Sequence, residues 1–427
     1  MNRTQQFFII AILVNVVYLC ITFFFYYFTD SFLMNMNNND YLSFHRAGQI
    51  VIEDLPNLYN PSEYHFPFRY LPLSAYFFVP FSMLGLKWGY FLFQIFNLIL
   101  NFTILYLIYK IIKVCKNRDE EELTDLEIGK LKDIFNNPKN ETILFQSAIF
   151  LIILPQFMNY FLGQINLLVL FFVLTSLLCL LKVGSKNDFM GGLLLGFGVL
   201  IKPTLILLLP FVIVLNYDRK AKKLIFKFKQ TLTRLSGSIT LIFISALFFL
   251  IYPQMLEDFI TVNLAGEYTY NIGGDLEINP SFSLTRIVLI FFEILGLESD
   301  GFVVFFIITL IILIPTYFLF IISTNHQNNL IIGYFSGIVI SLIVYFDSWP
   351  HHLVLLAPFM IFFLIFNKNF AKISFFKYIH YLLAFLMVIF WGVFYLTYEF
   401  IPFNIGGLAL IILLYYNLIL YYKKRAL

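Results

Sequence analysis

Long apolar stretches alternate with short polar segments along the whole 427-residue chain. A helix that crosses a bilayer needs about 20 apolar residues, and helices that meet at a cavity are often shorter. The pattern therefore predicts an all-α, polytopic membrane protein with about 12 transmembrane helices. Two more apolar stretches, 67–85 and 285–297, are interpreted as membrane-embedded segments that do not cross. The predicted spans are 7–28, 88–112, 143–162, 164–182, 189–201, 203–216, 235–252, 302–323, 331–346, 351–367, 378–397 and 404–422.

The composition agrees with a lipid environment. Hydrophobic residues make up 60% of the chain and charged residues only 12%, whereas soluble domains carry about 25% charged residues. The net charge of +3 gives no indication of nucleic-acid binding. The three cysteines lie in or beside apolar runs and indicate no disulfide framework. The run 7–28 has no small-residue cleavage site, so we expect a retained first span.

Basic residues set the expected orientation. With a cytoplasmic N-terminus and alternating spans, 23 of the 28 Lys and Arg residues fall on the cytoplasmic side, as the positive-inside rule requires. Both termini are then cytoplasmic. Outward basic residues oppose this orientation, so their presence motivates a search for an anionic ligand on the outer side. The five exceptions are Arg46, Arg69, Lys87, Lys202 and Arg286.

The same topology suggests a division of the chain into three parts. These are an N-terminal module (1–252) with an outer loop (29–66) and cytoplasmic loops (113–142 and 217–234), an outer loop with a membrane-associated segment (253–301), and a C-terminal helical module (302–427).

The first outer loop contains a candidate helix. Tyr41, Phe44 and Ala47 recur at helical spacing, which predicts an amphipathic interfacial helix that ends near Pro56. Asp40 stands at its start, where it is either a plain helix N-cap or a functional carboxylate.

Polar residues interrupt the next apolar segments. Gln164 and Asn166 lie in a turn between two spans, where they either join helices by hydrogen bonds or face a ligand. Lys202-Pro203 breaks an apolar run near its middle. A lysine at membrane depth is costly and marks a site with a partner, and a broken helix is tolerated there where it lines a cavity.

Further polar groups fall on the outer side. Arg69 is either a snorkelling anchor or a ligand contact, and Arg286 follows a motif that begins at Asn279. Asp347, His351 and His352 share one short hinge, which is hard to explain as anchoring. Adjacent histidines point in different directions, so a shared metal ion is weakly supported.

In combination these motifs resemble glycosyltransferase family 87, the polyprenyl-phosphate-mannose-dependent mannosyltransferases of the GT-C class. The resemblance covers residues 1 to about 365 and rests on six motifs in order. They are Asp40 with Ala47 and Asn57-Leu58-Tyr59, Tyr70-Leu71-Pro72-Leu73, Gly163-Gln164-Ile165-Asn166, the Gly-rich run into Ile201-Lys202-Pro203, Asn279-Pro280-Ser281-Phe282-Ser283-Leu284, and Ser348-Trp349-Pro350-His351-His352.

The resemblance implies inverting, direct displacement of a hexose, mannose, from a polyprenyl- or dolichyl-phosphate sugar to a lipid-linked or glycan acceptor on the outer face. Asp40 would be the general base. No cofactor or metal ion is expected, and the partners are the lipid-phosphate sugar, the acceptor and membrane lipids. Lys202, Arg69, Arg286, His351 and His352 would bind the donor phosphate, and Gln164, Asn166, Asn279 and Asp347 would contact substrate.

Two other classes share this composition. A transporter or lipid flippase would favour an internal repeat and charges spread through both halves of the bilayer, whereas the polar residues here gather on one side. A structural membrane subunit would not need Lys202 or the histidine pair. Glucose and pentose donors are the rivals to mannose. We expect the cell membrane of a prokaryote, or the endoplasmic reticulum membrane in a eukaryote.

Overall fold

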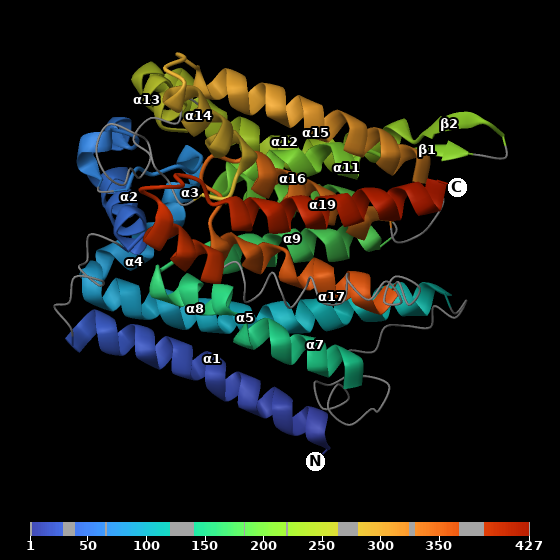
Figure 1. The fold of residues 1–427 in the computed structure, drawn as a ribbon, viewed down its shortest axis with the longest axis horizontal. Helices are drawn as coiled ribbons and strands as arrows, with labels where there is room; N and C mark the ends of the chain where they lie inside the picture. The colour runs from blue at the N-terminus through green and yellow to red at the C-terminus, as the bar shows by residue number, and fades with distance from the viewer. Residues whose placement is uncertain are drawn as a thin grey trace.

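Long apolar helices run side by side through the computed structural model of the chain (Figure 1). It describes residues 2–28, 39–64, 66–119, 141–182, 184–218, 221–263, 281–323, 329–366 and 388–426. Among these residues, five helices are long and apolar enough to cross a membrane. They are α1 (Arg3–Phe28), α5 (Gly85–Asp119), α12 (Phe228–Ile251), α15 (Gly301–Ser323) and α19 (Ile405–Ala426).

A sixth crossing is formed if a bent pair is counted as one span. Helices α7 (Glu141–Ile152) and α8 (Leu154–Phe161) meet at an angle of 42°. Pro155 lies in the first turn of α8, where its missing N–H costs no helical hydrogen bond. The expected span 143–162 is therefore a broken one.

Shorter helices complete the bundle, some of them at its centre. Residues of α9 and α16 are buried on nearly all sides, as expected for helices enclosed by other helices. The count of 12 crossings stays a prediction, because these elements are too short to span by themselves. They are α9 (Asn166–Leu181), α10 (Ser185–Ile201), α16 (Asn329–Val344), η8 (Pro350–Leu355), α17 (Ala357–Phe366) and Val388–Thr397.

The expected span 203–216 is not one continuous helix. A 3₁₀ segment, η7 (Pro203–Leu208), is followed by the single turn α11 (Leu209–Val212). Pro203 and Pro210 each remove a backbone donor, which favours helix starts over a continuous helix. The chain then forms an antiparallel hairpin, β1 (Leu215–Asp218) and β2 (Lys223–Phe226), that the sequence pattern did not predict.

Shorter helices gather at one end of the bundle, and the hairpin projects from the opposite end (Figure 1). The helix expected after Asp40 is α2, and its depth relative to a membrane surface stays a prediction. The short helices at this end are α2 (Tyr41–Glu53), η3 (Leu55–Asn57), η4 (Pro61–Glu63), α3 (Pro72–Ala75), η5 (Tyr76–Phe78), α4 (Val79–Met83), α13 (Pro253–Asn263) and α14 (Leu284–Ile294). The stretch 67–85 corresponds to α3, η5 and α4, and the stretch 285–297 to α14, so both form short helices rather than spans.

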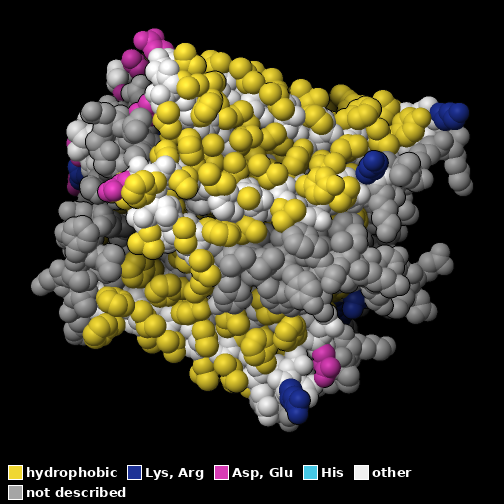
Figure 2. All heavy atoms as spheres, viewed as in Figure 1, with side chains coloured by type: hydrophobic (Ala, Val, Ile, Leu, Met, Phe, Trp, Pro, Cys, Tyr) yellow, Lys and Arg dark blue, Asp and Glu magenta, His cyan; other side chains and the backbone are white. Residues whose placement is uncertain are grey.

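The outer surface of the bundle is apolar. On α15, Ile311 is 65% exposed and Phe318 is 62% exposed, and α12 exposes Phe243 and Leu250. Hydrophobic side chains cover most of the described face (Figure 2). Such a continuous apolar surface is stable only against another apolar medium, so the chain is an integral membrane protein.

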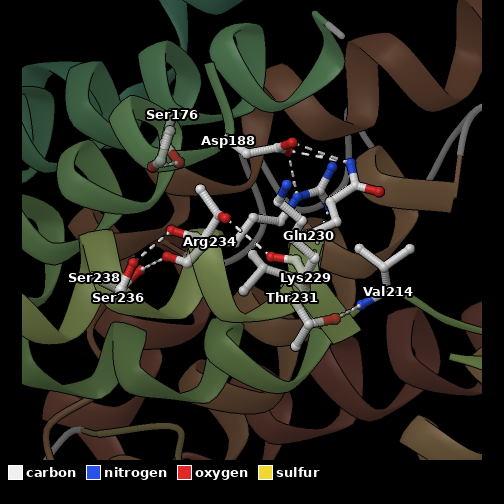
Figure 3. Close-up of polar contacts among 12 residues, drawn as sticks. Ser176, Asp188, Val214, Lys229, Gln230, Thr231, Arg234, Ser236 and Ser238 are labelled. Atoms are coloured by element: carbon white, nitrogen blue, oxygen red, sulfur yellow. Dashed lines mark hydrogen bonds and ion pairs between the residues drawn. The ribbon is translucent and has the colours of Figure 1, made fainter. Parts of the chain in front are cut away.

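Helices α10 and α12 pack at close range. A side chain at Gly192 or Gly196 would collide with the backbone of Arg234 or Ser238, so only glycine fits at these positions. Next to this contact, Asp188 accepts a hydrogen bond from Arg234 Nε at 2.7 Å and bonds from Gln230 at 3.2 Å (Figure 3). The buried ion pair fixes α10, whose far end carries Lys202.

The boundaries proposed at residues 252 and 301 stay predictions. The loop 113–142 and the first part of the 378–397 span lie largely outside the described residues, as does Asn279.

Candidate functional site

A cavity of about 420 Å³ opens at the α2 end of the bundle. Its volume lies in the range of small-molecule sites. The walls come from segments far apart in the sequence: the start of α2, residues 66–71, the turn at 162–164, the α10–η7 break and the hinge at 345–352. Seven residues singled out from the sequence line it: Asp40, Arg69, Gln164, Lys202, Asp347, His351 and His352.

Asp40 is not a helix N-cap in the usual sense. Its side chain makes no capping hydrogen bond, and the backbone N–H of Tyr41 is satisfied by Asn39 Oδ1 at 2.9 Å. The Asp40 carboxylate instead accepts a hydrogen bond from Gln164 Nε2. Asn39 therefore does the capping, and the Asp40 side chain turns to the cavity.

The surroundings of Asp40 change its acidity. Burial raises the pKa of this carboxyl from 3.8 to about 7, although the hydrogen bond from Gln164 and the charges of Arg69 and Lys202 act in the opposite direction. The negative charge of Asp347 adds to the rise. A carboxyl group with a pKa near neutrality is suited to proton transfer at physiological pH.

The turn that carries Gln164 depends on a left-handed glycine. Gly163 has φ of +62°, and a Cβ there would also meet Asn39 and Tyr41. The backbone N–H of Asp40 donates to Leu162 O at 3.0 Å. This turn and the start of α2 are therefore bonded to each other through both backbone and side chains.

Lys202 caps the C-terminal end of α10, at the break before Pro203. Its Nζ donates to Asn166 Oδ1 at 2.9 Å, and Asn166 Nδ2 donates to Asn159 Oδ1 at 3.1 Å. Asn159 Nδ2 donates in turn to the carbonyl of His351 at 3.0 Å. A chain of hydrogen bonds thus joins Lys202 to the hinge that carries His351. The sequence pattern singled out Lys202, Asn166 and His351 but not Asn159.

A polar ladder in α5 supports the same turn from behind. Gln94 Nε2 donates to Tyr160 O at 2.8 Å, and Asn97 Nδ2 donates to Gln164 O at 3.4 Å. Asn101 continues the row with a 2.7 Å bond to the Tyr160 hydroxyl. The sequence signal for this ladder was available, because three amides at helical spacing inside an apolar span need partners.

Two arginines meet at Asp347. Arg69 Nη2 lies 3.3 Å from one carboxylate oxygen, and Arg286 Nη2 lies 3.5 Å from the other. Arg69 also donates to Val262 O at 3.1 Å and lines the cavity. Arg286 is fully buried and does not line it. Arg286 therefore contacts the cavity wall through Asp347, and the phosphate contact predicted for it stays a prediction.

The histidines differ in what they offer to the cavity. His352 Nδ1 accepts a hydrogen bond from the Trp349 backbone at 3.3 Å. His351 Nδ1 is buried and makes no hydrogen bond among the described residues. No cluster of three or more His, Cys, Asp or Glu residues suited to a metal ion occurs within the described ranges.

The comparison with known families decides the class of protein. The model of glycosyltransferase family 87 matches residues 68–345. The chain belongs to glycosyltransferase family 87. No curated protein matches it in a sequence search.

Membership of family 87 makes this protein a membrane glycosyltransferase, with a sugar donor and an acceptor, rather than a transporter or a structural subunit. The matched segment contains Arg69, Gln164, Lys202 and Arg286, while Asp40 lies before it and the histidine hinge just after it. The cavity of this family 87 enzyme is therefore assembled from the matched segment and from both of its flanks.

Proposed function

We propose that this glycosyltransferase moves a hexose, mannose, from a polyprenyl- or dolichyl-phosphate sugar to a lipid-linked or glycan acceptor on the extracytoplasmic face, with inversion. One observation carries the proposal: Asp40 shares a single cavity with two cationic side chains, Lys202 and Arg69. A base for the acceptor and cations for a leaving phosphate are what direct displacement requires.

Asp40 acts as the general base in this scheme. Its ionised carboxylate takes the proton of the acceptor hydroxyl while that oxygen bonds to the anomeric carbon. The bond between the anomeric carbon and the donor phosphate oxygen breaks, and the lipid phosphate leaves with the electron pair. Gln164 orients the carboxylate through its hydrogen bond, and attack from the opposite face inverts the anomeric centre.

Lys202 and Arg69 stabilise the departing phosphate. Lys202 is held by Asn166, and Arg69 is held by Asp347 and by the Val262 carbonyl, so both cations are fixed before the donor binds. Preorganised charges at the point where negative charge develops are among the largest contributions to catalysis. His351 and His352 supply further polar atoms at this wall, and Asn279 remains a proposed substrate contact.

The apolar side of the cavity suits the polyprenyl chain. Ile206, Leu207 and Ile242 line the cavity, and Ile206 is also 49% exposed on the outside of the bundle. A lipid chain bound here would leave the phosphate next to Lys202, since Ile206 lies in the 3₁₀ segment that follows the lysine.

We also propose that the reaction needs no metal ion. Among the described residues, Asp40 and Asp347 are the carboxylates that line the cavity, and Asp347 is bonded to two arginines. Unchanged transfer in the presence of EDTA is the expected result, and loss of activity that Mg²⁺ or Mn²⁺ restores would contradict it.

A membrane assay with radiolabelled polyprenyl-phosphate sugars tests the function directly. Mannose, glucose and pentose donors are compared, and the wild-type enzyme is expected to consume the mannose donor fastest. Faster consumption of another lipid-phosphate sugar would change the proposed sugar and leave the proposed donor class intact. If nucleotide sugars are used and no lipid-phosphate sugar is consumed, the donor class is wrong.

The proposed orientation has its own test. Single cysteines near residues 60 and 125, in a background without Cys20, Cys115 and Cys179, are treated with an impermeant thiol reagent in intact cells or sealed vesicles. Labelling from opposite sides is expected. Labelling of both from one side would contradict the extracytoplasmic placement of the cavity.

A further inference from the structure

The β1–β2 hairpin has two chemically different faces. In its register, Leu215 pairs with Phe226 and Tyr217 pairs with Leu224. Side chains alternate between the faces of a strand, so these four residues share one face. Lys223 and Ile225 lie on the other face, with Asp218 and Asn216 as their partners.

The β2 half of the apolar face is exposed, whereas Leu215 and Tyr217 on β1 are partly buried. Leu224 is 61% exposed, Phe226 is 50% exposed, and Phe228, whose ring lies 5.9 Å from that of Phe226, is 64% exposed. An isolated two-stranded hairpin is only marginally stable in water. Exposed large apolar side chains in a row indicate a surface that another phase or molecule covers.

The same segment is strongly basic. Residues 215–229 contain six basic residues and one acidic residue. Lys222, Lys223, Lys227 and Lys229 are all exposed in the structure. A surface that combines exposed aromatic rings with lysines complements a layer that is apolar inside and anionic at its boundary.

The hairpin also continues the lipid-facing surface of the bundle. It lies at the end away from the cavity, where α12 begins at Phe228 and α15 ends at Ser323 (Figure 1). Leu232 on α12 and Phe318 on α15 are more than half exposed. Hydrophobic side chains extend from the bundle along this projection, and basic side chains lie at its far end (Figure 2).

We propose that the hairpin is a docking surface for anionic phospholipids in the leaflet at this end of the bundle. Leu224, Phe226 and Phe228 insert at the boundary between headgroups and acyl chains. The lysines around them bind the lipid phosphates. The surface is distinct from the cavity and does not depend on the proposed reaction.

The first experiment places a fluorescent reporter on each face of the full-length protein in nanodiscs. Phe226→Trp reports the apolar face and Ile225→Trp the opposite face, with the emission of the parent protein subtracted. Brominated lipids are expected to quench Phe226→Trp at least twice as strongly as Ile225→Trp. Water-like emission from Phe226→Trp overturns the proposal, as does blue-shifted emission without lipid quenching, which indicates that protein covers the face.

A second experiment tests the charge without changing the apolar face. The melting temperature of the detergent-solubilised parent is expected to rise when phosphatidylglycerol, but not phosphatidylcholine, is added. Lys223→Gln with Lys227→Gln should lose at least half of this rise. Lys182→Gln with Lys186→Gln is the matched control and should keep it. Equal losses in both double variants, or no rise in the parent, overturn the proposal.

Discussion

The ammonium group of Lys202 donates a hydrogen bond to Asn166 Oδ1 at 2.9 Å, across 36 positions of sequence. This contact ties the break at the end of α10 to the turn that carries Gln164, and Gln164 in turn bonds Asp40. The proposed phosphate-binding cation and the proposed base are therefore held by one short segment of chain. A change at Lys202 is expected to weaken donor binding, whereas a change at Asp40 is expected to slow the transfer itself.

Asp40→Asn is expected to lower the transfer rate by about 10²- to 10⁴-fold, the usual contribution of a general base. The amide keeps the shape of the side chain but cannot take the acceptor proton. Radiolabel transfer in membranes measures the effect. Asp54→Asn, an exposed carboxylate in the same outer segment, is the control and should transfer at the wild-type rate.

The melting temperature of Asp40→Asn provides a check on folding. Because the pKa of Asp40 is raised from 3.8 to about 7 in the folded protein, this group stabilises the fold fully below pH 3.8, and that contribution is lost as the pH rises to 7. The variant should therefore melt no lower than wild type at pH 8. A lower melting temperature would assign the lost activity to misfolding.

The pH dependence of the wild-type enzyme should follow Asp40. The base works when ionised, so kcat/KM is expected to rise about tenfold per pH unit below 7 and to level off above it. Gln164→Leu removes a hydrogen bond that lowers the pKa of Asp40, so the rising, acidic limb of this pH profile should move to higher pH. Asp347→Asn removes a neighbouring negative charge and should move it to lower pH. Shifts of the same sign in both variants would exclude Asp40 as the titrating group.

Lys202→Ala should weaken binding of the lipid-phosphate donor. A charged hydrogen-bond donor contributes about 1.5–3 kcal/mol, so the donor KM is expected to rise about 10- to 100-fold, the acceptor KM changing less. Lys182→Ala, at the other end of the neighbouring helix, should leave both unchanged. An unaltered donor KM in Lys202→Ala would assign Lys202 a structural role.

The ion pairs at Asp347 should contribute more to stability than a more solvent-accessible pair of the same kind. Asp347→Asn removes the charge that Arg69 and Arg286 both contact, at a cost of about 3 kcal/mol in the free energy of unfolding. Glu63→Gln breaks the more exposed, partly buried pair with Arg46 and should cost less than about 1 kcal/mol. Thermal unfolding in detergent compares them, and equal losses would contradict a structural role for Asp347.

Asn97 is expected to position Gln164 without touching substrate. Asn97→Leu removes the hydrogen bond to the Gln164 carbonyl, and a bond of this strength corresponds to about a tenfold fall in kcat. The acidic limb of the pH profile should move to higher pH, because Gln164 is less firmly held against Asp40. Asn101→Leu removes a bond one turn further along α5. It should lower stability and leave the limb in place.

The sequence by itself determined the class of the protein and most of the candidate site. Apolar runs of span length leave a helical membrane protein as the stable solution, because backbone polar groups in lipid must be satisfied within helices. Polar residues such as Gln164 and Lys202 stood out for the same reason, since each is costly in an apolar run unless it has a partner. Their order along the chain was enough to suggest family 87.

Only the tertiary structure decided which groups meet. Asp40 and Gln164 are 124 positions apart, and whether the carboxylate caps α2 or turns to Gln164 depends on packing rather than on local pattern. The same holds for Arg286, which lies behind Asp347 instead of in the cavity. Hydropathy is a sum over neighbours in sequence, whereas charge pairing depends on distances in space, so the sequence predicts a polar outlier without predicting its partner.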